Sequence, residues 1–219
     1  MRNLVAAAAL LLVGSVAPPD PFAEFAALCG KVRPLWGRDA CGPLLLVDPA
    51  TRAIHANAPD AKGALKRNGT VWSGTLPGDV PIANTALDWN GVRWTMLRRP
   101  LPDDARARRI LLIHEAFHRI QPALGFHVRE ADNGHLDGAD GRIWLRLELR
   151  ALDTALAGGT NWREAARDAL AFRAERRRLA GAEAAAAEDA LERNEGLAEY
   201  TGIRVGAASA AIAAARARL

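Results

Sequence analysis

The chain has 219 residues, of which half are apolar and a quarter are charged, a composition typical of a folded globular protein with a sizeable core. Its formal net charge is +4, and since only Lys31, Lys62 and Lys66 are lysines, 26 of its 29 basic residues are arginines. The densest basic run, residues 173–178, contains an acid and lacks interleaved aromatic residues, so we expect no nucleic-acid partner.

Residues 1–17 have the order of an export signal. Arg2 is followed by an uninterrupted apolar run from Leu4 to Val13 and then by small residues up to Ala17. This order predicts a secretory signal peptide, and the run is too short to cross a membrane. A buried N-terminal helix is the alternative. We therefore predict a periplasmic or secreted protein that keeps no stable membrane anchor after signal cleavage.

The chain has two cysteines, Cys29 and Cys41. In an exported protein such a pair predicts a disulfide, which would stabilise the fold by about 3 kcal/mol from loop-closure entropy. Two unpaired thiols are the alternative, because the sequence does not give the distance between them. Their spacing is not that of a CxxC pair, so we do not expect them to bind a metal.

Residues 18–100 are predicted to be mainly β-structure. Short runs rich in β-branched and aromatic residues, such as 70–75 and 92–97, are separated by Gly, Pro or Asn-Gly. Asn90-Gly91 is a strong signal for a two-residue hairpin turn. We expect an antiparallel β-meander of four to six strands.

Residues 101–219 are predicted to be helical. Asp103 or Asp104 can cap a helix that runs to about Gln121, and further helices are expected at 141–157, 162–179 and 182–202. The tail that follows has helical propensity and low complexity. The predicted fold class is therefore α+β, with the β-meander packed on the helical half as one compact unit.

The sequence HEAFH, residues 114–118, is the strongest functional motif. His114 and His118 are four residues apart, so on a helix they lie on one face and can chelate one ion. Glu115, one position further round the helix, can take the proton of a metal-bound water. The alternative is an ordinary amphipathic helix whose apolar stripe contains Ile110, Ile113 and Phe117.

A catalytic zinc ion needs a third protein ligand and one open position. The segment RNEGLAEYTG, residues 193–202, offers Glu195 and Glu199, again four residues apart on a predicted helix. One carboxylate can ligate zinc while the other accepts a hydrogen bond from an imidazole N–H. Glu148, on the same helix face as Trp144 and Leu152, is the alternative ligand; an ion pair with an arginine is its other explanation.

HEAFH followed by NEGLAEY, residues 194–200, resembles the gluzincin metallopeptidases of the thermolysin and aminopeptidase type. The resemblance implies that His114, His118 and Glu195 bind one Zn²⁺, that Glu115 is the general base, and that Glu199 holds a histidine from behind. It also implies a peptide or protein substrate, received by the edge of a sheet.

Residues 92–97 are the candidate edge strand for that substrate, by β-augmentation. The metzincin class is excluded, because Gln121 and Leu124 stand where its motif has Gly and His. One departure from the gluzincin pattern is the interval between His118 and Glu195, which is far longer than the roughly twenty residues common in thermolysin-type enzymes.

Other polar residues have weaker claims. His127, His135 and Tyr200 are candidate donors to a transition-state oxyanion, with surface or core roles as their alternatives. Glu188 and Glu192 continue the acidic stripe of the last helix and are expected to be solvated.

Three functions follow from these motifs. The first is an exported zinc metallopeptidase. The second, a di-iron carboxylate protein, needs a second ExxH motif, which the chain lacks. The third is a non-catalytic exported binding or assembly domain in which the metal is structural or absent.

Overall fold

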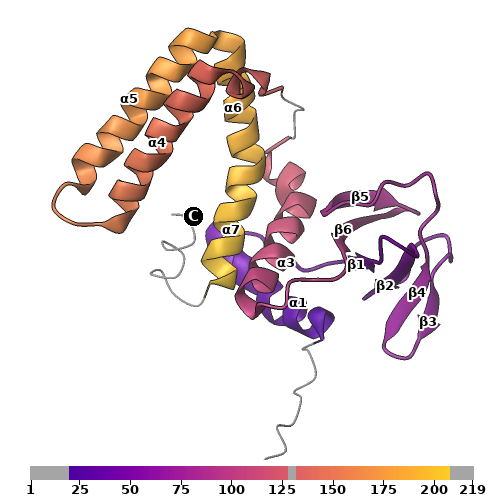
Figure 1. Cartoon of the computed structure of the whole chain (residues 1–219). Helices are drawn as coiled ribbons and strands as arrows, with labels where there is room; N and C mark the ends of the chain where they lie inside the picture. The colour runs from indigo at the N-terminus through magenta and orange to yellow at the C-terminus, as the bar shows by residue number, and fades with distance from the viewer. Residues whose placement is uncertain (1–19, 128–131, 208–219) are drawn as a thin grey trace, which may run out of the picture.

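The computed structural model of the chain describes residues 20–127 and 132–207. The predicted signal peptide at 1–17 and the tail from residue 208 onward lie outside the described residues. The predicted α+β fold class is confirmed, because a six-stranded sheet occupies the N-terminal half and helices dominate the C-terminal half (Figure 1). None of the described helices is long and apolar enough to cross a membrane.

The long helices of the C-terminal half follow the predicted order with small shifts at their ends. The strands are β1 (Leu44–Val47), β2 (Ala53–Ala56), β3 (Lys66–Asn68), β4 (Val71–Thr75), β5 (Thr85–Trp89) and β6 (Val92–Arg98). The helices before and within the HEAFH region are α1 (Pro21–Cys29), η1 (Gly30–Val32), α2 (Arg33–Trp36), α3 (Ala105–Ile120) and η2 (Gln121–Leu124). The later helices are η3 (Gly134–Asp137), α4 (Ala139–Ala157), α5 (Trp162–Ala180), α6 (Ala182–Leu191), η4 (Glu192–Gly196) and α7 (Leu197–Gly206).

The sheet has the strand order β3-β4-β2-β1-β6-β5. The predicted hairpin turn is present: Asn90 and Gly91 have φ of 48° and 76° and join β5 to β6. The expectation of a purely antiparallel meander is wrong at one pair, since β1 and β6 run parallel. β1 lies between β2 and β6, and apolar clusters cover both of its faces, as is typical of a central strand.

The strand proposed to receive substrate is also not at an edge. Residues 92–97 belong to β6, which is hydrogen-bonded to β1 on one side and to β5 on the other. The edge strand next to it is β5. The buried run Trp94–Leu97 is consistent with a strand inside the sheet rather than at its edge.

Two apolar clusters lie on the two faces of the sheet. Leu44 and Leu46 of β1 face a cluster formed with α1 and α3, whereas Leu45 and Val47 face a second cluster built around Trp94. This alternation follows from the two-residue period of a strand. The first cluster buries one face of α3 against the sheet and so fixes the helix that carries HEAFH.

α3 begins where the sequence predicts it, because the Asp104 carboxylate accepts a hydrogen bond from the N–H of Ala107 at 2.7 Å. The N-terminal segment is fastened to the other end of α3. Cys29 and Cys41 form the predicted disulfide, with Cα atoms 4.8 Å apart. The Arg119 guanidinium donates hydrogen bonds to the carbonyls of Ala40 and Cys41 at 3.1 and 2.6 Å, which ties this loop to the helix.

α7 lies alongside α3 at very short range. A Cβ on Gly202 would stand 2.7 Å from the carbonyl oxygen of Ile110, and one on Gly206 would stand 2.7 Å from its nitrogen. These two glycines, four residues apart on one helix face, therefore let the two backbones touch. This close approach brings the acids of the last helix within reach of the histidines on α3.

α4 and α5 form an antiparallel hairpin that projects from the end of α6, apart from the sheet (Figure 1). Inside it, Trp144 and Phe172 pack with their ring centroids 6.1 Å apart. The hairpin is inserted between HEAFH and NEGLAEY in the sequence, which accounts for the long interval between the two motifs.

Candidate metal centre

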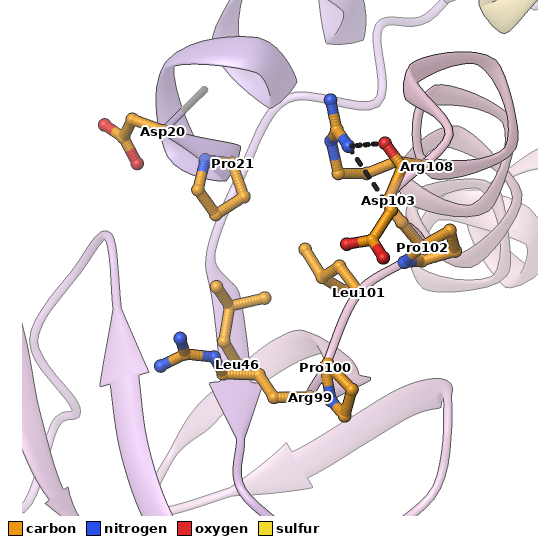
Figure 2. Close-up of a pocket in the computed structure, with 9 residues that line it drawn as sticks. All are labelled: Asp20, Pro21, Leu46, Arg99, Pro100, Leu101, Pro102, Asp103 and Arg108. Carbon is orange, nitrogen blue, oxygen red and sulfur yellow. Dashed lines mark hydrogen bonds between the residues drawn. The ribbon is translucent and has the colours of Figure 1, made fainter. Parts of the chain in front are cut away.

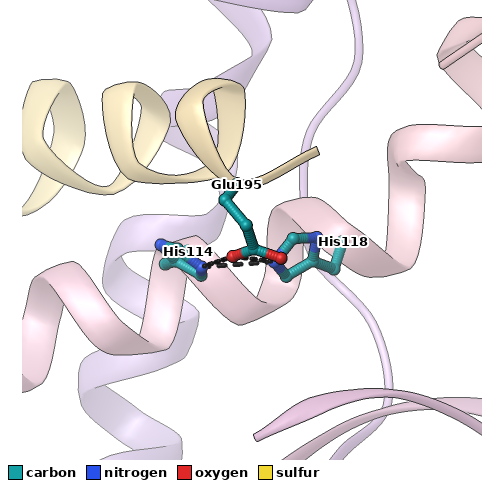
Figure 3. A group of neighbouring side chains, drawn as sticks. All are labelled: His114, His118 and Glu195. Carbon is teal, nitrogen blue, oxygen red and sulfur yellow. Dashed lines mark hydrogen bonds and ion pairs between the residues drawn. The ribbon is translucent and has the colours of Figure 1, made fainter. Parts of the chain in front are cut away.

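Three side chains from two helices converge beside α3. His114 and His118 project from consecutive turns of α3, as the four-residue spacing predicts, and Glu195 reaches them from the facing helix (Figure 3). Among the described residues, these three form a group that could hold a metal ion. HEAFH thus contributes two polar side chains to this group, while the apolar residues of α3 pack against the sheet.

The distances within this group fit a small tetrahedral ion. The two imidazole Nε2 atoms are 3.2 Å apart, and Glu195 Oε2 lies 3.3 Å from His114 Nε2 and 3.5 Å from His118 Nε2. Ligand bonds of about 2.0–2.1 Å in a tetrahedral zinc site place the ligand atoms about 3.3–3.4 Å from one another. All three edges of the observed triangle agree with that spacing.

Glu195 is presented by a local break in the helix. α6 and α7 are joined by η4, a π-helical turn that contains Glu195. Such turns are rare and occur frequently at functional sites, because the wider turn changes the direction of the side chains it carries. Asn194 Nδ2 donates a hydrogen bond to Glu195 Oε1 at 2.9 Å, so Oε2 is the oxygen directed at the histidines.

The outer nitrogen of each histidine already has a hydrogen-bond acceptor. His114 Nδ1 lies 3.1 Å from Glu199 Oε2, as the resemblance to gluzincins implies. His118 Nδ1 lies 2.9 Å from Gln121 Oε1. With their protons on Nδ1, both neutral imidazoles turn bare Nε2 lone pairs toward each other and toward Glu195. Three acceptors at this distance need a shared cation, either a proton or a metal ion.

Glu115 lies on the buried side of the group. Its Oε1 is 4.0 Å from His114 Nε2, and its Oε2 is buried without a hydrogen-bond partner. Burial, helped by the charge of Glu195, raises the Glu115 pKa from 4.5 to about 7, although His114 opposes the rise. A carboxyl group with a pKa near neutrality can both accept and release a proton, which suits a general base. A cation bound by the histidines would lower this pKa again.

The two imidazoles differ in their affinity for a proton. Burial lowers the pKa of His118, with only partial compensation from Gln121 and Glu195. Burial opposes protonation of His114 too, but the hydrogen bond to Glu199 and the charges of Glu115 and Glu195 raise its pKa overall. His114 is thus the more basic ligand of the pair.

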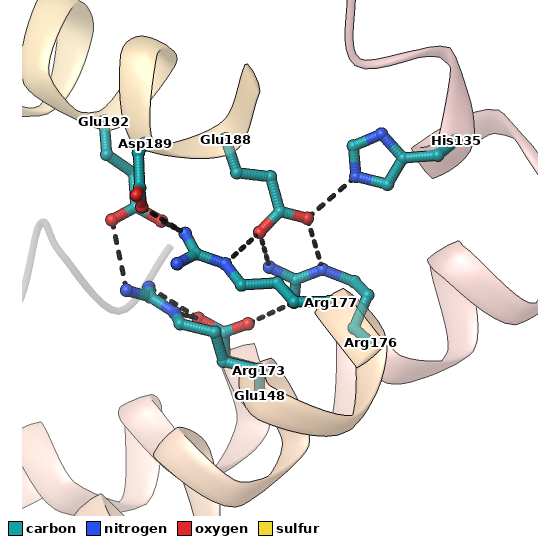
Figure 4. Close-up of polar contacts among 8 residues, drawn as sticks. All are labelled: His135, Glu148, Arg173, Arg176, Arg177, Glu188, Asp189 and Glu192. Carbon is teal, nitrogen blue, oxygen red and sulfur yellow. Dashed lines mark hydrogen bonds and ion pairs between the residues drawn. The ribbon is translucent and has the colours of Figure 1, made fainter. Parts of the chain in front are cut away.

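The rival ligand Glu148 lies in a different cluster. Its carboxylate forms ion pairs with Arg173 at 2.7 Å and with Arg176, whose side chain is as buried as its own (Figure 4). The expectation that Glu148 is buried is correct, and the arginine explanation, on a neighbouring helix, is the one that the structure supports. Both carboxylate oxygens are engaged there, so Glu148 is not part of the histidine group.

Glu188 and His135 belong to this arginine cluster as well. Glu188 was expected to be solvated, yet it is only 3% exposed and accepts hydrogen bonds from Arg176, Arg177 and His135 (Figure 4). His135 is therefore engaged away from the metal-ligand group and is not placed as an oxyanion donor. The expectation that Glu188 is solvated was wrong, because α5 packs its arginines against this residue. The sequence alone does not show which helix faces Glu188.

The remaining candidates are placed as follows. His127 lines a small cavity with Gln121, Arg193 and Asn194, beside the turn that carries Glu195. Tyr200 is 47% exposed, and Arg204 lies over its ring at 5.9 Å. Glu192 is exposed and pairs with arginines of α5.

An apolar cavity of about 280 Å³ lies away from the histidines. It lies between the start of α1, strand β1 and the segment that leads into α3, and it is lined largely by Leu46, Leu101 and three prolines (Figure 2). Its buried cation, Arg108, is already paired with Glu24 at 2.6 Å and donates to the carbonyls of Pro102 and Asp103. The buried cation of this cavity is thus engaged in holding the segment that leads into α3, and we locate the candidate functional site at the histidines instead.

Two residues of the site were not identified from the sequence. Gln121 served there only to exclude the metzincins, and Asn194 only as part of a motif. A polar residue one turn after His118 on the same face was the available signal for Gln121. Asn194 gave no comparable signal, because its role depends on the π-helical turn.

The comparisons with known proteins find no match: no family model matches the chain, and neither a curated protein nor a solved structure is significantly similar to it.

Proposed function

We propose that this protein is an exported zinc-dependent hydrolase, specifically a gluzincin-like metallopeptidase. The observation that carries the proposal is the triangle formed by His114, His118 and Glu195, with edges of 3.2, 3.3 and 3.5 Å and both outer imidazole nitrogens already engaged. Zinc accepts this ligand set, two imidazoles and one carboxylate, in catalytic sites.

Three ligands leave a fourth position for water or substrate. The side chain of Glu195 is 48% exposed, whereas those of the histidines are 16% and 11% exposed, so the group opens to solvent on the Glu195 side. A structural zinc site has four protein ligands and no open position. Glu148 was the candidate for a fourth protein ligand, but it forms ion pairs with Arg173 and Arg176 in a different cluster. The open position favours catalysis over a structural metal.

Bound zinc supplies a polarised carbonyl and a water of lowered pKa. His114, His118 and Glu195 would hold the ion, and Glu115, beside them, would serve as the general base and then as the proton donor to the leaving amine of a peptide. Glu199 keeps the Nδ1 proton of His114 in place, so that Nε2 stays available as a ligand. In the metal-free protein, burial raises the Glu115 pKa to about 7, and a bound cation would lower it and so favour the carboxylate form that a base needs.

An extended peptide is the substrate that the neighbouring sheet favours. β5 is an edge strand that packs against α3. Because Trp89 and Val92 flank the two-residue turn as a hydrogen-bonded pair, the strand alternation directs the main-chain groups of Ala86 and Asp88 to the free edge. A peptide strand can pair with these groups by β-augmentation. Ala86→Pro removes one such donor and should raise KM without loss of zinc.

Export is part of the proposal. It rests on the signal-like residues 1–17 and is compatible with the Cys29–Cys41 disulfide, since disulfides persist in oxidising compartments. Fractionation of cells that express the full chain tests it: the processed protein should leave the cytoplasm, and a fully cytoplasmic, unprocessed chain would contradict it.

Metal stoichiometry is the first test. The purified protein, without a polyhistidine tag, should hold one zinc per chain by elemental analysis. His118→Ala and Glu195→Ala should lose it, whereas the matched controls His55→Ala, on β2, and Glu183→Ala, on the exposed side of α6, should keep it. No zinc in a folded and reconstituted wild type would contradict the proposal.

Turnover is the second test. Zinc-loaded wild type should cleave an internally quenched peptide library, and Glu115→Gln should keep its zinc and lose at least roughly 100-fold in kcat/KM. Full activity in that variant would remove Glu115 as the base. Zinc binding without any cleavage by wild type would instead favour a non-catalytic metal-binding domain.

A further inference from the structure

Gln121 is the only glutamine of the chain, and its side chain is almost fully buried, with 1% of the residue exposed. It lies one turn after His118, at the start of η2. Its amide contacts both halves of the candidate metal centre. Oε1 lies 2.9 Å from His118 Nδ1, and Nε2 donates hydrogen bonds to the carbonyls of Arg193 and Asn194 at 2.8 and 3.2 Å.

These contacts determine which way the amide and the imidazole face. Main-chain carbonyls can only accept hydrogen bonds, so the NH₂ group of Gln121 must point at residues 193 and 194. Its oxygen then faces His118, and Nδ1 of that imidazole must carry the proton. Nε2 is consequently left as a lone pair directed at His114 and Glu195, which is the tautomer that a metal ligand requires.

The other end of the same amide holds the turn that carries Glu195. The carbonyls of Arg193 and Asn194 belong to η4, where the π-helical pattern interrupts the regular i+4 hydrogen bonding. Both hydrogens of the amide are used there. If η4 relaxed to a regular α-helix, the direction of Glu195 would change, because one residue of rotation is about 100° on a helix.

We propose that Gln121 is the positioning residue of this site, fixing the tautomer of His118 and the π-helical turn of Glu195 with one amide group. This inference rests on the proposed function, because positioning these side chains matters only if they bind a metal ion. It adds a testable statement about the metal-free protein, namely that two ligands far apart in the sequence are aligned before any ion binds.

Two substitutions separate the two ends of the amide. Gln121→Glu keeps an acceptor for the His118 Nδ1 proton but cannot donate to the carbonyls of η4. Gln121→Met has a similar size and does neither. Asn57→Leu is the control for loss of a bridging amide, because the exposed Asn57 side chain also joins two main-chain groups outside the histidine group, accepting from Leu44 at 2.7 Å and donating to Gly42 at 3.0 Å.

The first readout is nitrogen NMR of the metal-free protein at pH 8. Wild type, Gln121→Glu and Asn57→Leu should show His118 protonated on Nδ1, and Gln121→Met should show both tautomers. Labelling glutamine alone gives a single side-chain NH₂ pair, which should exchange slowly with solvent in wild type. Wild-type tautomer in Gln121→Met, or a rapidly exchanging NH₂ pair in wild type, would overturn the proposal.

The second readout is zinc affinity by competition with a chelator. Loss of an outer hydrogen-bond partner typically weakens metal binding by about 10–100-fold, and we expect a loss of this size in Gln121→Met. Gln121→Glu should fall between it and wild type, with faster hydrogen exchange at residues 192–196. If Gln121→Met loses stability like Asn57→Leu but keeps its tautomer and zinc affinity, Gln121 is merely structural.

These results are distinguishable from failure of the proposed function. A wild type that binds no zinc would remove the metal centre, whereas the tautomer of His118 and the protection of the Gln121 NH₂ group are measured without metal. The positioning role stands or falls on those two signals.

Discussion

Glu188 and Glu195 lie on one continuous helical segment, seven residues apart, and meet opposite surroundings. Glu188 faces α5, whose Arg176 and Arg177 donate hydrogen bonds to it at 2.8 and 2.7 Å. Glu195 faces α3, where the nearest groups are the lone pairs of His114 and His118. The same residue type in the same acidic stripe is therefore paired with arginines in one place and left beside two imidazoles, as a candidate ligand, in the other.

A similar contrast appears in the carboxyl pKa values of Glu188 and of Glu115, the acid next to His114. Burial raises the Glu188 pKa, but hydrogen bonds from Arg176, His135 and Arg177 outweigh it and lower the value to about 2. Glu115, beside the histidines, has its pKa raised to about 7 by burial. A complete set of cationic partners stabilises a buried carboxylate for structural use, whereas their absence preserves its reactivity.

The largest expected effect comes from breaking the arginine cluster. Arg176→Met leaves the carboxylates of Glu148 and Glu188 buried without their shared partner, and should lower the free energy of unfolding by about 3–5 kcal/mol. Urea denaturation measures it. Arg178→Met, which removes an exposed pair with Glu175, is the control and should leave the midpoint unchanged. A loss below about 1 kcal/mol in Arg176→Met would show that this cluster does not secure the hairpin.

At the histidine site, the free energy of unfolding should depend on bound zinc, and this dependence should not require the arginine cluster. Zinc at a free concentration 1,000-fold above its Kd should raise the free energy of unfolding by about 4 kcal/mol. The increase should disappear in His118→Ala and Glu195→Ala and persist in Arg176→Met. Denaturation with zinc and with a chelator gives both values. An equal increase in all variants would indicate binding elsewhere.

In the metal-free protein, Glu188 and Glu115 should change the free energy of unfolding in opposite directions as the pH rises. We call the two pH ranges the acid limb, due to Glu188, and the upper limb, due to Glu115. Because the Glu188 pKa falls from 4.5 to about 2 on folding, its contribution to stability is present above pH 4.5 and is lost as the pH falls toward 2. Because the Glu115 pKa rises from 4.5 to about 7, stability falls as the pH rises from 4.5 to 7. Each limb amounts to about 3 kcal/mol.

Two neutral variants test these limbs separately. Glu188→Gln should remove the acid limb, and Glu115→Gln should remove the loss between pH 4.5 and 7, as followed by denaturation at a series of pH values. Saturating zinc should also flatten the upper limb in wild type, since a bound cation lowers the Glu115 pKa. An upper limb unchanged in Glu115→Gln would assign it to another group.

The smallest effect concerns the contact that brings the two helices together. Gly202→Ala places a Cβ 2.7 Å from the Ile110 carbonyl and should cost about 1–3 kcal/mol, with weaker zinc binding as α7 moves away. Gly196→Ala is the control, since a Cβ there meets nothing within 4 Å, and should be neutral or stabilising by up to about 1 kcal/mol. Equal stability of the two variants would contradict the close-packing argument.

Local chemistry in the sequence was sufficient for much of the fold and half of the site. The helix cap at Asp104, the turn at Asn90-Gly91 and the spacing of His114 and His118 each depend on neighbours within four residues. Such features follow from the period of a helix or the twist of a hairpin, so the sequence predicts them directly.

The errors concern contacts between segments far apart in the chain. The placement of β6 inside the sheet depends on β1, about fifty residues earlier. The burial of Glu188 depends on Arg176 and Arg177 of α5. The role of Glu148 depends on arginines of that same helix. A periodic pattern shows that a face is apolar or acidic, but it does not show which other face it meets.

The sequence by itself determined a helix with two histidines and a glutamate on adjacent positions, because helical geometry alone aligns residues four apart. Only the tertiary structure decided which acid completes the group. Glu195 reaches the histidines because Gly202 and Gly206 let α7 touch α3 and because η4 redirects its side chain. The first cause is a close approach of two backbones that lie far apart in the sequence, and the second is a π-helical turn whose carbonyls bond to the Gln121 amide, so the residue pattern of a single helix shows neither.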